Sequence, residues 1–318
     1  MLIGHSKARE VLTHSLANLS HAYHFSGIEG IGKKLFAVWI AKYLLCEKGS
    51  PLFTPCACPS CTQVDNNMHP DLHRFSDNKK KKDSDGSDSK DDALSLRKDE
   101  GDKDDYAVES IRRITEIVDS TSYSGKWKVI ILDGAHRLSS GGQTAAANSL
   151  LKTLEEPGSD TVFFLVTHRS DLMLSTILSR CQTVHFSPLS LSELEQICQK
   201  NGFNYNRDLL SAAGGSVSNL LCLTKFDIKG FLTAADTGNY EELAERIFSF
   251  SVKDRHALPV VIDNLRIHLI QKHSSFNDKS HIQLIQYLDR FSKDIQYNVN
   301  INIMLLDLYA NLTRETVL

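Results

Sequence analysis

Apolar residues before Pro188 fall into short continuous runs that alternate with stretches of helical spacing. Three of the runs, Ala22–Ser26, Lys128–Asp133 and Val162–Thr167, predict strands that are covered on both faces. Apolar positions with helical spacing predict helices within residues 1–19, 35–46, 108–118 and 143–156. Strands that alternate with helices indicate an α/β fold in which helices flank a parallel sheet.

After Pro188 the pattern predicts helices and no strong strand. Short helices are expected at Leu191–Lys200 and Arg207–Ala213, before Gly214 and Gly215 interrupt the chain. Longer amphipathic stretches follow at Leu243–Phe250, Leu258–Ile270, Ile282–Phe291 and Ile301–Leu312. The sequence therefore predicts an all-helical C-terminal part.

The stretch Ser76–Asp105 departs from both patterns. It consists mainly of Lys, Asp, Ser and Gly, which cannot bury enough apolar surface to offset the entropy lost on ordering. We predict a disordered insertion. Its four lysines, Lys79 to Lys82, could form a nucleic-acid patch, but the acidic residues that follow favour a solvated loop.

Length and charge add broad limits. A chain of 318 residues, 41% of them hydrophobic, is long enough for two or three domains with buried cores. The formal net charge of −3 neither favours nor excludes nucleic acid as a partner. We find no long apolar run and no signal-peptide pattern, so we expect a soluble, cytoplasmic protein with no membrane partner.

The loop between the first strand and the next helix matches a P-loop. Its sequence is Gly27-Ile28-Glu29-Gly30-Ile31-Gly32-Lys33-Lys34, with Gly27, Gly30, Gly32 and Lys33 at the phosphate-binding positions. Backbone N–H groups of such a loop converge on phosphate oxygens, and the lysine reaches the outer phosphates. Lys34 stands where a Ser or Thr hydroxyl holds magnesium. The sequence leaves open whether ATP or ADP binds here without metal, or whether the loop only packs the helix on the strand.

Asp133 ends the second predicted strand, where the aspartate of a nucleotidase contacts magnesium. The next residue is Gly134, although an ATPase needs a carboxylate there to orient the attacking water. Loss of a catalytic base lowers the rate by about 10²–10⁴. His136 could replace that base, but we favour a surface or structural histidine because it lies three residues along the chain.

Four of the seven cysteines, Cys46, Cys56, Cys58 and Cys61, fall within one short stretch. In the cytosol this grouping favours a metal over disulfides, and four thiolates predict a structural zinc site without an open position. The single residue between Cys56 and Cys58 is a tight spacing for tetrahedral geometry. His69 is therefore an alternative ligand, and a cluster of free thiols is the alternative to a metal.

Ser179-Arg180-Cys181 follows a predicted helical turn and precedes the short apolar run Val184–Phe186. Arg180 could cap a helix at the surface, or its guanidinium could neutralise a phosphate held by a neighbouring subunit. Cys181 has no candidate base nearby, so we interpret it as a packing residue.

With these motifs the chain resembles the delta prime subunits of the bacterial DNA polymerase III clamp loader, in the AAA+ superfamily. The matching stretches are His21–Gly27, the cysteine cluster with His69-Pro70-Asp71, Asn148–Pro157, Thr176–Gln182 and, more weakly, Asn298–Asn300. They cover nearly the whole chain except Ser76–Asp105. The run Leu150–Pro157 followed by Ser-Arg-Cys is highly specific for clamp-loader subunits. One departure is the gap between Cys56 and Cys58, which is a residue shorter than in the family.

The resemblance implies three domains. The first is an AAA+ P-loop domain at residues 1–187, which contains a zinc module at about 46–61 and the insertion at 76–105. A helical lid at 188–228 and a helical collar at 229–318 follow. In the family, the collar holds a five-subunit ring together.

The resemblance also implies partners and roles. The partners would be gamma or tau and delta subunits in a hetero-pentameric ring, with the sliding clamp and primed DNA contacted through the complex. Arg180 would act in trans as an arginine finger on ATP bound by the adjacent gamma or tau subunit. Delta prime does not itself hydrolyse ATP, so this chain would belong to a DNA-directed DNA polymerase holoenzyme, a nucleotidyltransferase, without ATPase activity of its own.

Asn219 stands where the lid of active relatives carries a phosphate-sensing arginine. Together with Lys34 and Gly134, it would be a third lost contact to nucleotide. Two alternatives remain at this point. The chain could be an active clamp-loader ATPase of the gamma or tau type, or a zinc-dependent nucleic-acid-binding module on a decayed ATPase frame.

Overall fold

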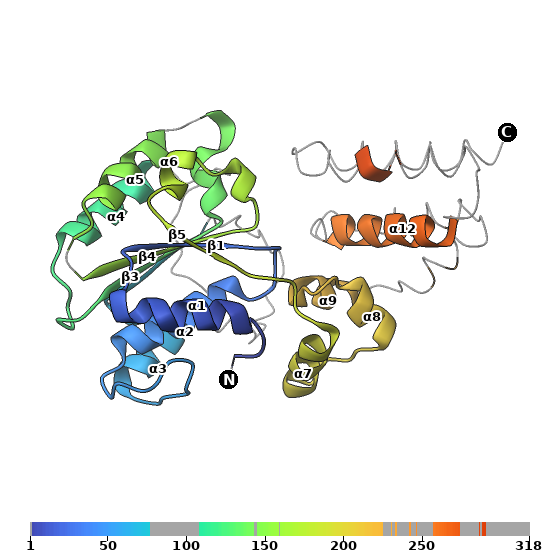
Figure 1. The fold of residues 1–318 in the computed structure, drawn as a ribbon, viewed down its shortest axis with the longest axis horizontal. Coiled ribbons are helices and arrows are strands. Elements are labelled where there is room, and N and C mark those ends of the chain that lie inside the picture. The colour runs from blue at the N-terminus through green and yellow to red at the C-terminus, as the bar shows by residue number, and fades with distance from the viewer. Residues whose placement is uncertain are drawn as a thin grey trace, which may run out of the picture. The chain divides into compact units, whose positions relative to one another are not determined.

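The computed structural model of this chain describes residues 2–76, 108–142, 145–158, 160–224 and 257–273, and after these also 286 and 288–290, with 230, 233, 242 and 246 between. They belong to two compact units, Met1–Leu189 and Ser190–Leu318 (Figure 1). The predicted insertion lies outside the described residues except for Ser76. That residue does not open the insertion, because it pairs with Asp133 as the last residue of a strand.

A parallel sheet lies at the centre of the first unit (Figure 1). Its five strands are hydrogen-bonded in the order β2-β3-β4-β1-β5. The strands are β1 (Ala22–Ser26), β2 (Leu72–Ser76), β3 (Lys128–Asp133), β4 (Thr161–Thr167) and β5 (Gln182–His185). The three predicted strands correspond to β1, β3 and β4, which are the three inner strands. The prediction of a parallel sheet flanked by helices is therefore confirmed.

Alternate residues of the inner strands enter two separate cores, one on each face of the sheet. Phe25 and Phe164 pack on one side, while Phe163 and Leu165 pack on the other. Both faces are covered by helices, as a parallel sheet requires (Figure 1). The helices are α1 (Ser6–Ser15), α2 (Lys33–Leu45) and α3 (Pro59–Asp65) on the first face, and α4 (Val108–Asp119), α5 (Ala145–Glu155) and α6 (Ser175–Leu178) on the second.

The two edge strands, β2 and β5, were not predicted as strands. Each is short and only partly buried, with His73, Arg74 and Thr183 among the residues that are not buried. An edge strand needs fewer apolar residues because one side has no neighbouring strand. The continuous apolar run that reveals an inner strand is therefore absent from both.

The second unit is helical in its described residues. A capping box of Ser190 and Glu193 begins α7 (Leu191–Asn201), and Gly202 ends it. Asn206 caps α8 (Arg207–Ala212), and Ser216 caps α9 (Val217–Leu223). These helices confirm the predicted short helices, and α12 (Ala257–His273) confirms a helix at 258–270, although its apolar residues are not gathered on one side as predicted. The predicted stretches at 243–250, 282–291 and 301–312 lie almost wholly outside the described residues.

The first unit places several loops at one edge of the sheet. Parallel strands all end on the same side, and the register pairs Ser26 with Thr167 and Asp133 with Val166. The loop after β1, the turn after β3 with η2 (Ala135–Gly142), and the turn after β4 with η3 (Ser170–Leu172) therefore start close together. In open α/β sheets this is where ligands bind.

Gly27, the first residue after β1, has no room for a side chain. A Cβ atom there would lie 2.5 Å from the carbonyl oxygen of Phe186, and φ is +149°. We expect Gly27→Ala to lower the free energy of unfolding by about 2 kcal/mol more than Gly125→Ala. Gly125 is a matched control because its φ is +66° and its Cβ would meet nothing within 4 Å. Urea unfolding measures both, and equal losses would contradict the steric argument.

Candidate functional site

The glycine-rich loop joins β1 to α2 with a backbone that only glycine adopts readily. Gly27, Gly30 and Gly32 all have positive φ, at +149°, +74° and +98°. Lys33 is the first residue of α2, so the first N–H groups of that helix face the loop. A strand, a tight turn and a helix N-terminus in this order form the frame that a phosphate cradle requires.

Lys33 lies inside this loop. Its side chain is buried, and Nζ donates hydrogen bonds to the carbonyl oxygens of Gly27, at 2.8 Å, and Ile28, at 2.6 Å. Burial lowers the pKa of Lys33 to about 8, against the attraction of Asp133 and Glu29, which raises it. The ammonium group is thus held by the loop at the position from which a P-loop lysine reaches phosphate.

Lys34 forms an ion pair with Asp133, with 3.0 Å between Nζ and Oδ2. The side chains are 28% and 34% exposed, so the pair is reachable from solvent. Magnesium binding at a P-loop requires a hydroxyl at position 34 and a carboxylate at 133 that is available to the ion. Here the hydroxyl is missing and an ammonium group contacts the carboxylate. These residues do not fit a magnesium ion.

Gly134 directly follows Asp133 and has a φ of +73°. This left-handed backbone disfavours any residue with a Cβ atom, including the glutamate that an ATPase needs there. At position 134 the absence of a carboxylate therefore coincides with a backbone conformation that favours glycine. The sequence alone reveals the glycine but not this conformation.

His136 is a structural residue rather than a surface one. It is buried, Nδ1 lies 3.0 Å from Oγ1 of Thr167, and its ring contacts that of His168 edge-on. Burial lowers the pKa of His136 to about 4, and repulsion from His168 and Arg169 acts in the same direction. A group with so low a pKa is a poor general base near neutral pH.

Two further histidines lie at this loop, and sequence analysis missed both. His5 precedes α1, yet its Nε2 lies 2.7 Å from the carbonyl oxygen of Ile31, so it braces the loop. Burial lowers the pKa of His168, with Glu29 opposing that shift and Lys33 adding to it, which indicates that these charges influence one another. Neither histidine forms a local motif with the P-loop, so no sequence signal announces them.

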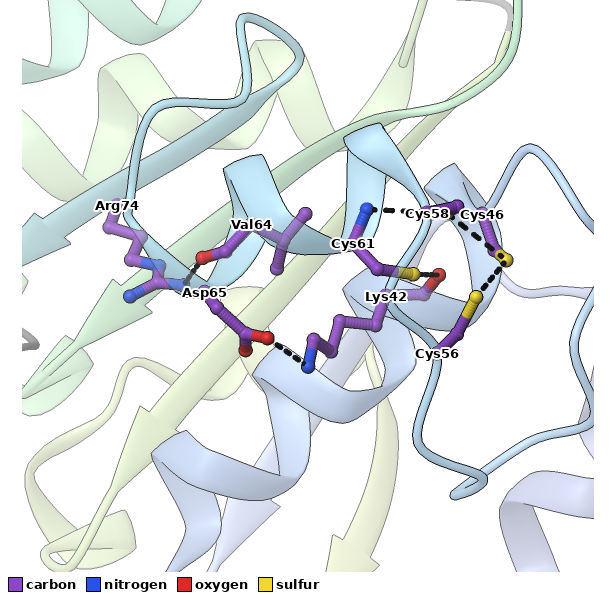
Figure 2. Close-up of polar contacts among 8 residues, drawn as sticks. All are labelled: Lys42, Cys46, Cys56, Cys58, Cys61, Val64, Asp65 and Arg74. Atoms are coloured by element: carbon purple, nitrogen blue, oxygen red, sulfur yellow. Dashed lines mark hydrogen bonds and ion pairs between the residues drawn. The ribbon is translucent and has the colours of Figure 1, made fainter.

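The four clustered cysteines come together at the end of α2 and the start of α3 (Figure 2). Their sulfur atoms all lie within 4.8 Å of one another, and this group could hold a metal ion. The distances from Sγ of Cys46 to Sγ of Cys56 and of Cys58 are both 3.8 Å. The short spacing between Cys56 and Cys58 does not exclude either residue. His69 is not a member of the group, and its Nδ1 accepts a hydrogen bond from the amide of Asp71.

Cys46, Cys58 and Cys61 are buried and Cys56 is half-buried, and hydrogen bonds favour negative charge at the sulfur atom of Cys46. Burial alone would raise the pKa of Cys46, but hydrogen bonds, chiefly from Ser50, lower it to about 6. Burial and the neighbouring sulfurs raise the pKa of Cys61. Sulfurs this close repel one another when ionised, and a bound cation removes that penalty.

The side chains of Asp71 and Lys126 join the chain before residue 76 to the chain after residue 108. The carboxylate of Asp71 accepts hydrogen bonds from the amides of Tyr123, at 2.6 Å, and Ser124, at 2.8 Å. Nζ of Lys126 donates to the carbonyl oxygen of Cys46 at 2.8 Å. The cysteine cluster is thereby fixed to the segment that leads into β3.

Arg180 follows α6 at the surface, where its side chain is 33% exposed. Nη1 donates to the carbonyl oxygen of Thr176 at 2.8 Å, and Nη2 contacts the carboxylate of Glu155. These contacts are those of a helix-capping arginine, and they also hold the guanidinium in place. Cys181 packs against the core with its pKa raised by burial to about 12, in agreement with a packing role.

A family model described as DNA polymerase III, delta subunit matches residues 4–190, which is more than half of the chain. The chain belongs to this DNA polymerase III delta subunit family. The match includes the loop, the ion pair, the cysteine cluster and Arg180, so every feature of this site lies within the part that defines the family.

Two curated relatives refine the assignment. Subunit delta' of Bacillus subtilis is 34% identical over 178 residues, 56% of this chain and 45% of that protein. Subunit tau of Salmonella typhimurium is 33% identical over 219 residues, 66% of this chain and 29% of that protein. The resemblance to delta prime subunits is confirmed, although the aligned part covers less than half the length of these two relatives.

A solved structure, a DNA polymerase III gamma subunit-related protein from Thermotoga maritima, has the same fold. It aligns with a TM-score of 0.51 and 16% identity, over 95% of this chain and 97% of that one. The likeness shows that the two chains share a fold.

Two other findings concern the rest of the molecule. Asn219 lies in α9 of the second unit, where its Nδ2 donates to the carbonyl oxygen of Ala213 at 3.4 Å. Within the described ranges, none of the helices has both the length and the apolar character needed to cross a bilayer.

The low pKa of His136 predicts a loss of stability in acid. The ordinary pKa of 6.5 applies to the unfolded chain, so between pH 6.5 and about 4 the unfolded state binds more protons. The stability that the neutral imidazole contributes is present above pH 6.5 and is lost as the pH falls toward 4. Between about pH 7.5 and pH 5, His136→Gln should therefore lose less unfolding free energy than the unchanged protein. Above pH 7 the two should respond alike, and parallel curves throughout would contradict the assignment.

Proposed function

We propose that this chain is a non-hydrolysing delta prime subunit of the DNA polymerase III clamp loader. The observation that carries the proposal is the ion pair between Lys34 and Asp133, followed by Gly134 in a left-handed turn. Magnesium and an activated water are both required for ATP hydrolysis, and these residues favour neither. Family membership and relatives named DNA polymerase III subunits support the place in the complex.

In this proposal the chain contributes to catalysis at a neighbour's site. Arg180 would act as an arginine finger on ATP bound by an adjacent gamma or tau subunit. Its partial exposure and the contacts to Thr176 and Glu155, which position the guanidinium at the surface, support that role. A positioned guanidinium loses less entropy when it meets a phosphate than a freely moving side chain.

The remaining parts would serve assembly. Residues 188–228 would form the lid, with Asn219 in place of a phosphate-sensing arginine, and residues 229–318 would form the collar. The collar would join gamma or tau and delta subunits in a hetero-pentameric ring, which loads the sliding clamp on primed DNA in the cytoplasm. The capped helices α7, α8 and α9 support a compact lid.

We also propose that Cys46, Cys56, Cys58 and Cys61 bind a structural zinc ion. Four thiolates at about 2.3 Å from zinc in a tetrahedron lie about 3.8 Å apart. The distances of 3.8 Å from Cys46 to Cys56 and to Cys58 agree with that geometry. With four thiolate ligands zinc has no open position, so its role would be to stabilise the link between α2 and α3.

A second candidate is an active ATPase of the gamma or tau type. Subunit tau of Salmonella typhimurium favours this candidate, since it aligns with a larger share of this chain than subunit delta' of Bacillus subtilis. The P-loop glycines and Lys33 are also retained. The two candidates differ in whether the purified chain turns over ATP.

The test of the proposed function is ATP turnover, alone and in the complex. We expect no turnover by the chain alone, and Arg180→Ala should lower the DNA-stimulated ATPase of the complete complex while assembly persists. An arginine finger contributes about 10³–10⁵ in rate, and one of several fingers in a ring should cost less, about tenfold. Arg112→Ala removes an exposed arginine on α4 and should change nothing.

Turnover by the chain alone would instead establish the gamma or tau type. Unchanged ATPase of a complex that carries Arg180→Ala would refute the role in trans. Gel filtration of the complex is needed beside the assay, because a variant that does not assemble loses activity for another reason.

For the metal, elemental analysis of protein purified under reducing conditions should find about one zinc ion per chain. Cys58→Ser should weaken retention of zinc against a chelator by at least about tenfold. Cys222→Ser, at a half-buried cysteine in α9, should retain zinc as the unchanged protein does. Protein without zinc, or equal retention in both variants, would refute the assignment.

A further inference from the structure

The ion pair between Lys34 and Asp133 lies where a P-loop site holds its metal. Lys34 is the second residue of α2, and Asp133 is the last residue of β3. Their side chains meet across the edge of the sheet with 3.0 Å between Nζ and Oδ2. An ammonium group thus contacts the carboxylate oxygen that magnesium or its water would contact in an active site.

The charged side chains named here, at this edge of the sheet, carry a net positive charge, which favours binding of an anion. Three cationic side chains, Lys33, Lys34 and Arg137, stand against the carboxylates of Glu29 and Asp133. Asp133 and Glu29 both attract Lys33, and Glu29 also attracts Arg137. In an active P-loop the bound divalent ion is often the largest local positive charge. In this chain the protein's own side chains supply the positive charge.

Magnesium and an ammonium group cannot both occupy this position. Magnesium requires six oxygen ligands at about 2.1 Å in an octahedron. Position 34 offers no oxygen, and Asp133 already has a cationic partner at 3.0 Å. To bind magnesium, Asp133 would have to exchange that partner for a strongly hydrated ion.

We propose that the ammonium group of Lys34 takes the place of magnesium, so that this P-loop binds a diphosphate or triphosphate group without a divalent cation. Phosphate oxygens would meet the N–H groups at the start of α2 and both ammonium groups. Lys33 would exchange its bonds to the carbonyls of Gly27 and Ile28 for bonds to phosphate. The bound group keeps its phosphates, because neither a metal nor a base at position 134 activates water.

This inference rests on the proposed absence of hydrolysis, but it concerns binding and has a test of its own. A chain that turned over ATP would refute the proposed function. The inference instead stands or falls with the effect of magnesium on affinity, measured with ligands that need no hydrolysis.

The experiment is a calorimetric titration of the full chain with ADP, in EDTA and in excess magnesium chloride. We expect ADP to bind in EDTA with an affinity at least equal to that in magnesium. Magnesium should weaken binding by a few fold, about two to five, because it competes for the phosphates. Pyrophosphate in a parallel titration separates a site for the phosphate chain alone from one that also requires the nucleoside.

The decisive variant is Lys34→Thr, which supplies the hydroxyl ligand and frees Asp133. Its binding of ADP should become dependent on magnesium, with at least about tenfold higher affinity in magnesium than in EDTA. Lys33→Ala should abolish binding under both conditions. Lys7→Thr makes the same replacement as Lys34→Thr at an exposed position on α1 and should behave as the unchanged protein.

Four outcomes would overturn the inference. They are no binding of either ligand at millimolar concentration, at least tenfold tighter binding by the unchanged protein in magnesium, binding that survives Lys33→Ala, and a Lys34→Thr variant indifferent to magnesium. Urea unfolding of each variant confirms that it is folded. Asp133→Asn provides a second route if Lys34→Thr is unstable, since removal of the carboxylate should leave ADP binding in EDTA intact.

Discussion

Parallel hydrogen bonding between β3, β4 and β1 is the constraint on which the first unit depends. It aligns the carboxyl ends of strands that are distant in the sequence, so that Ser26, Thr167 and Asp133 end at the same edge. Apolar side chains on both faces hold the ladder in register, because a slip of one residue would exchange the two cores. The polar chemistry of the protein follows from what comes immediately after each strand.

The loops after these strands form a P-loop site in which Lys34 replaces the hydroxyl residue that binds magnesium and Gly134 replaces the catalytic carboxylate. The loop retains its glycines, and Lys33 is buried in it. The cation that contacts Asp133 is the ammonium group of Lys34. A bound metal adjusts its ligands and leaves when the nucleotide leaves, whereas a lysine is attached to its helix. Such a site is suited to a subunit that does not hydrolyse ATP, as proposed for this chain in the DNA polymerase III complex.

The sequence predicted those features that depend on neighbours in the chain. Inner strands were recognisable because both faces are apolar, and the P-loop and the cysteines because their spacing is local. Strands β2 and β5 were missed because an edge needs less burial. The contact of His5 with Ile31 and the influence of Glu29 on His168 were missed because the fold, not spacing, creates them. The sequence could not decide whether His136 lies at the surface or is buried, because histidine occurs in both environments.

The contacts of Asp71 with Tyr123 and Ser124, and of Lys126 with Cys46, have a consequence for how this protein can vary. They close the chain on itself on either side of residues 77–107, next to the paired strands β2 and β3. The free energy cost of closing a flexible loop grows only with the logarithm of its length. With these contacts in place, the number of residues between 76 and 108 should therefore have little effect on the stability of the sheet. The P-loop and the cysteine cluster are therefore held by contacts between described segments, and these contacts do not involve residues 77–107.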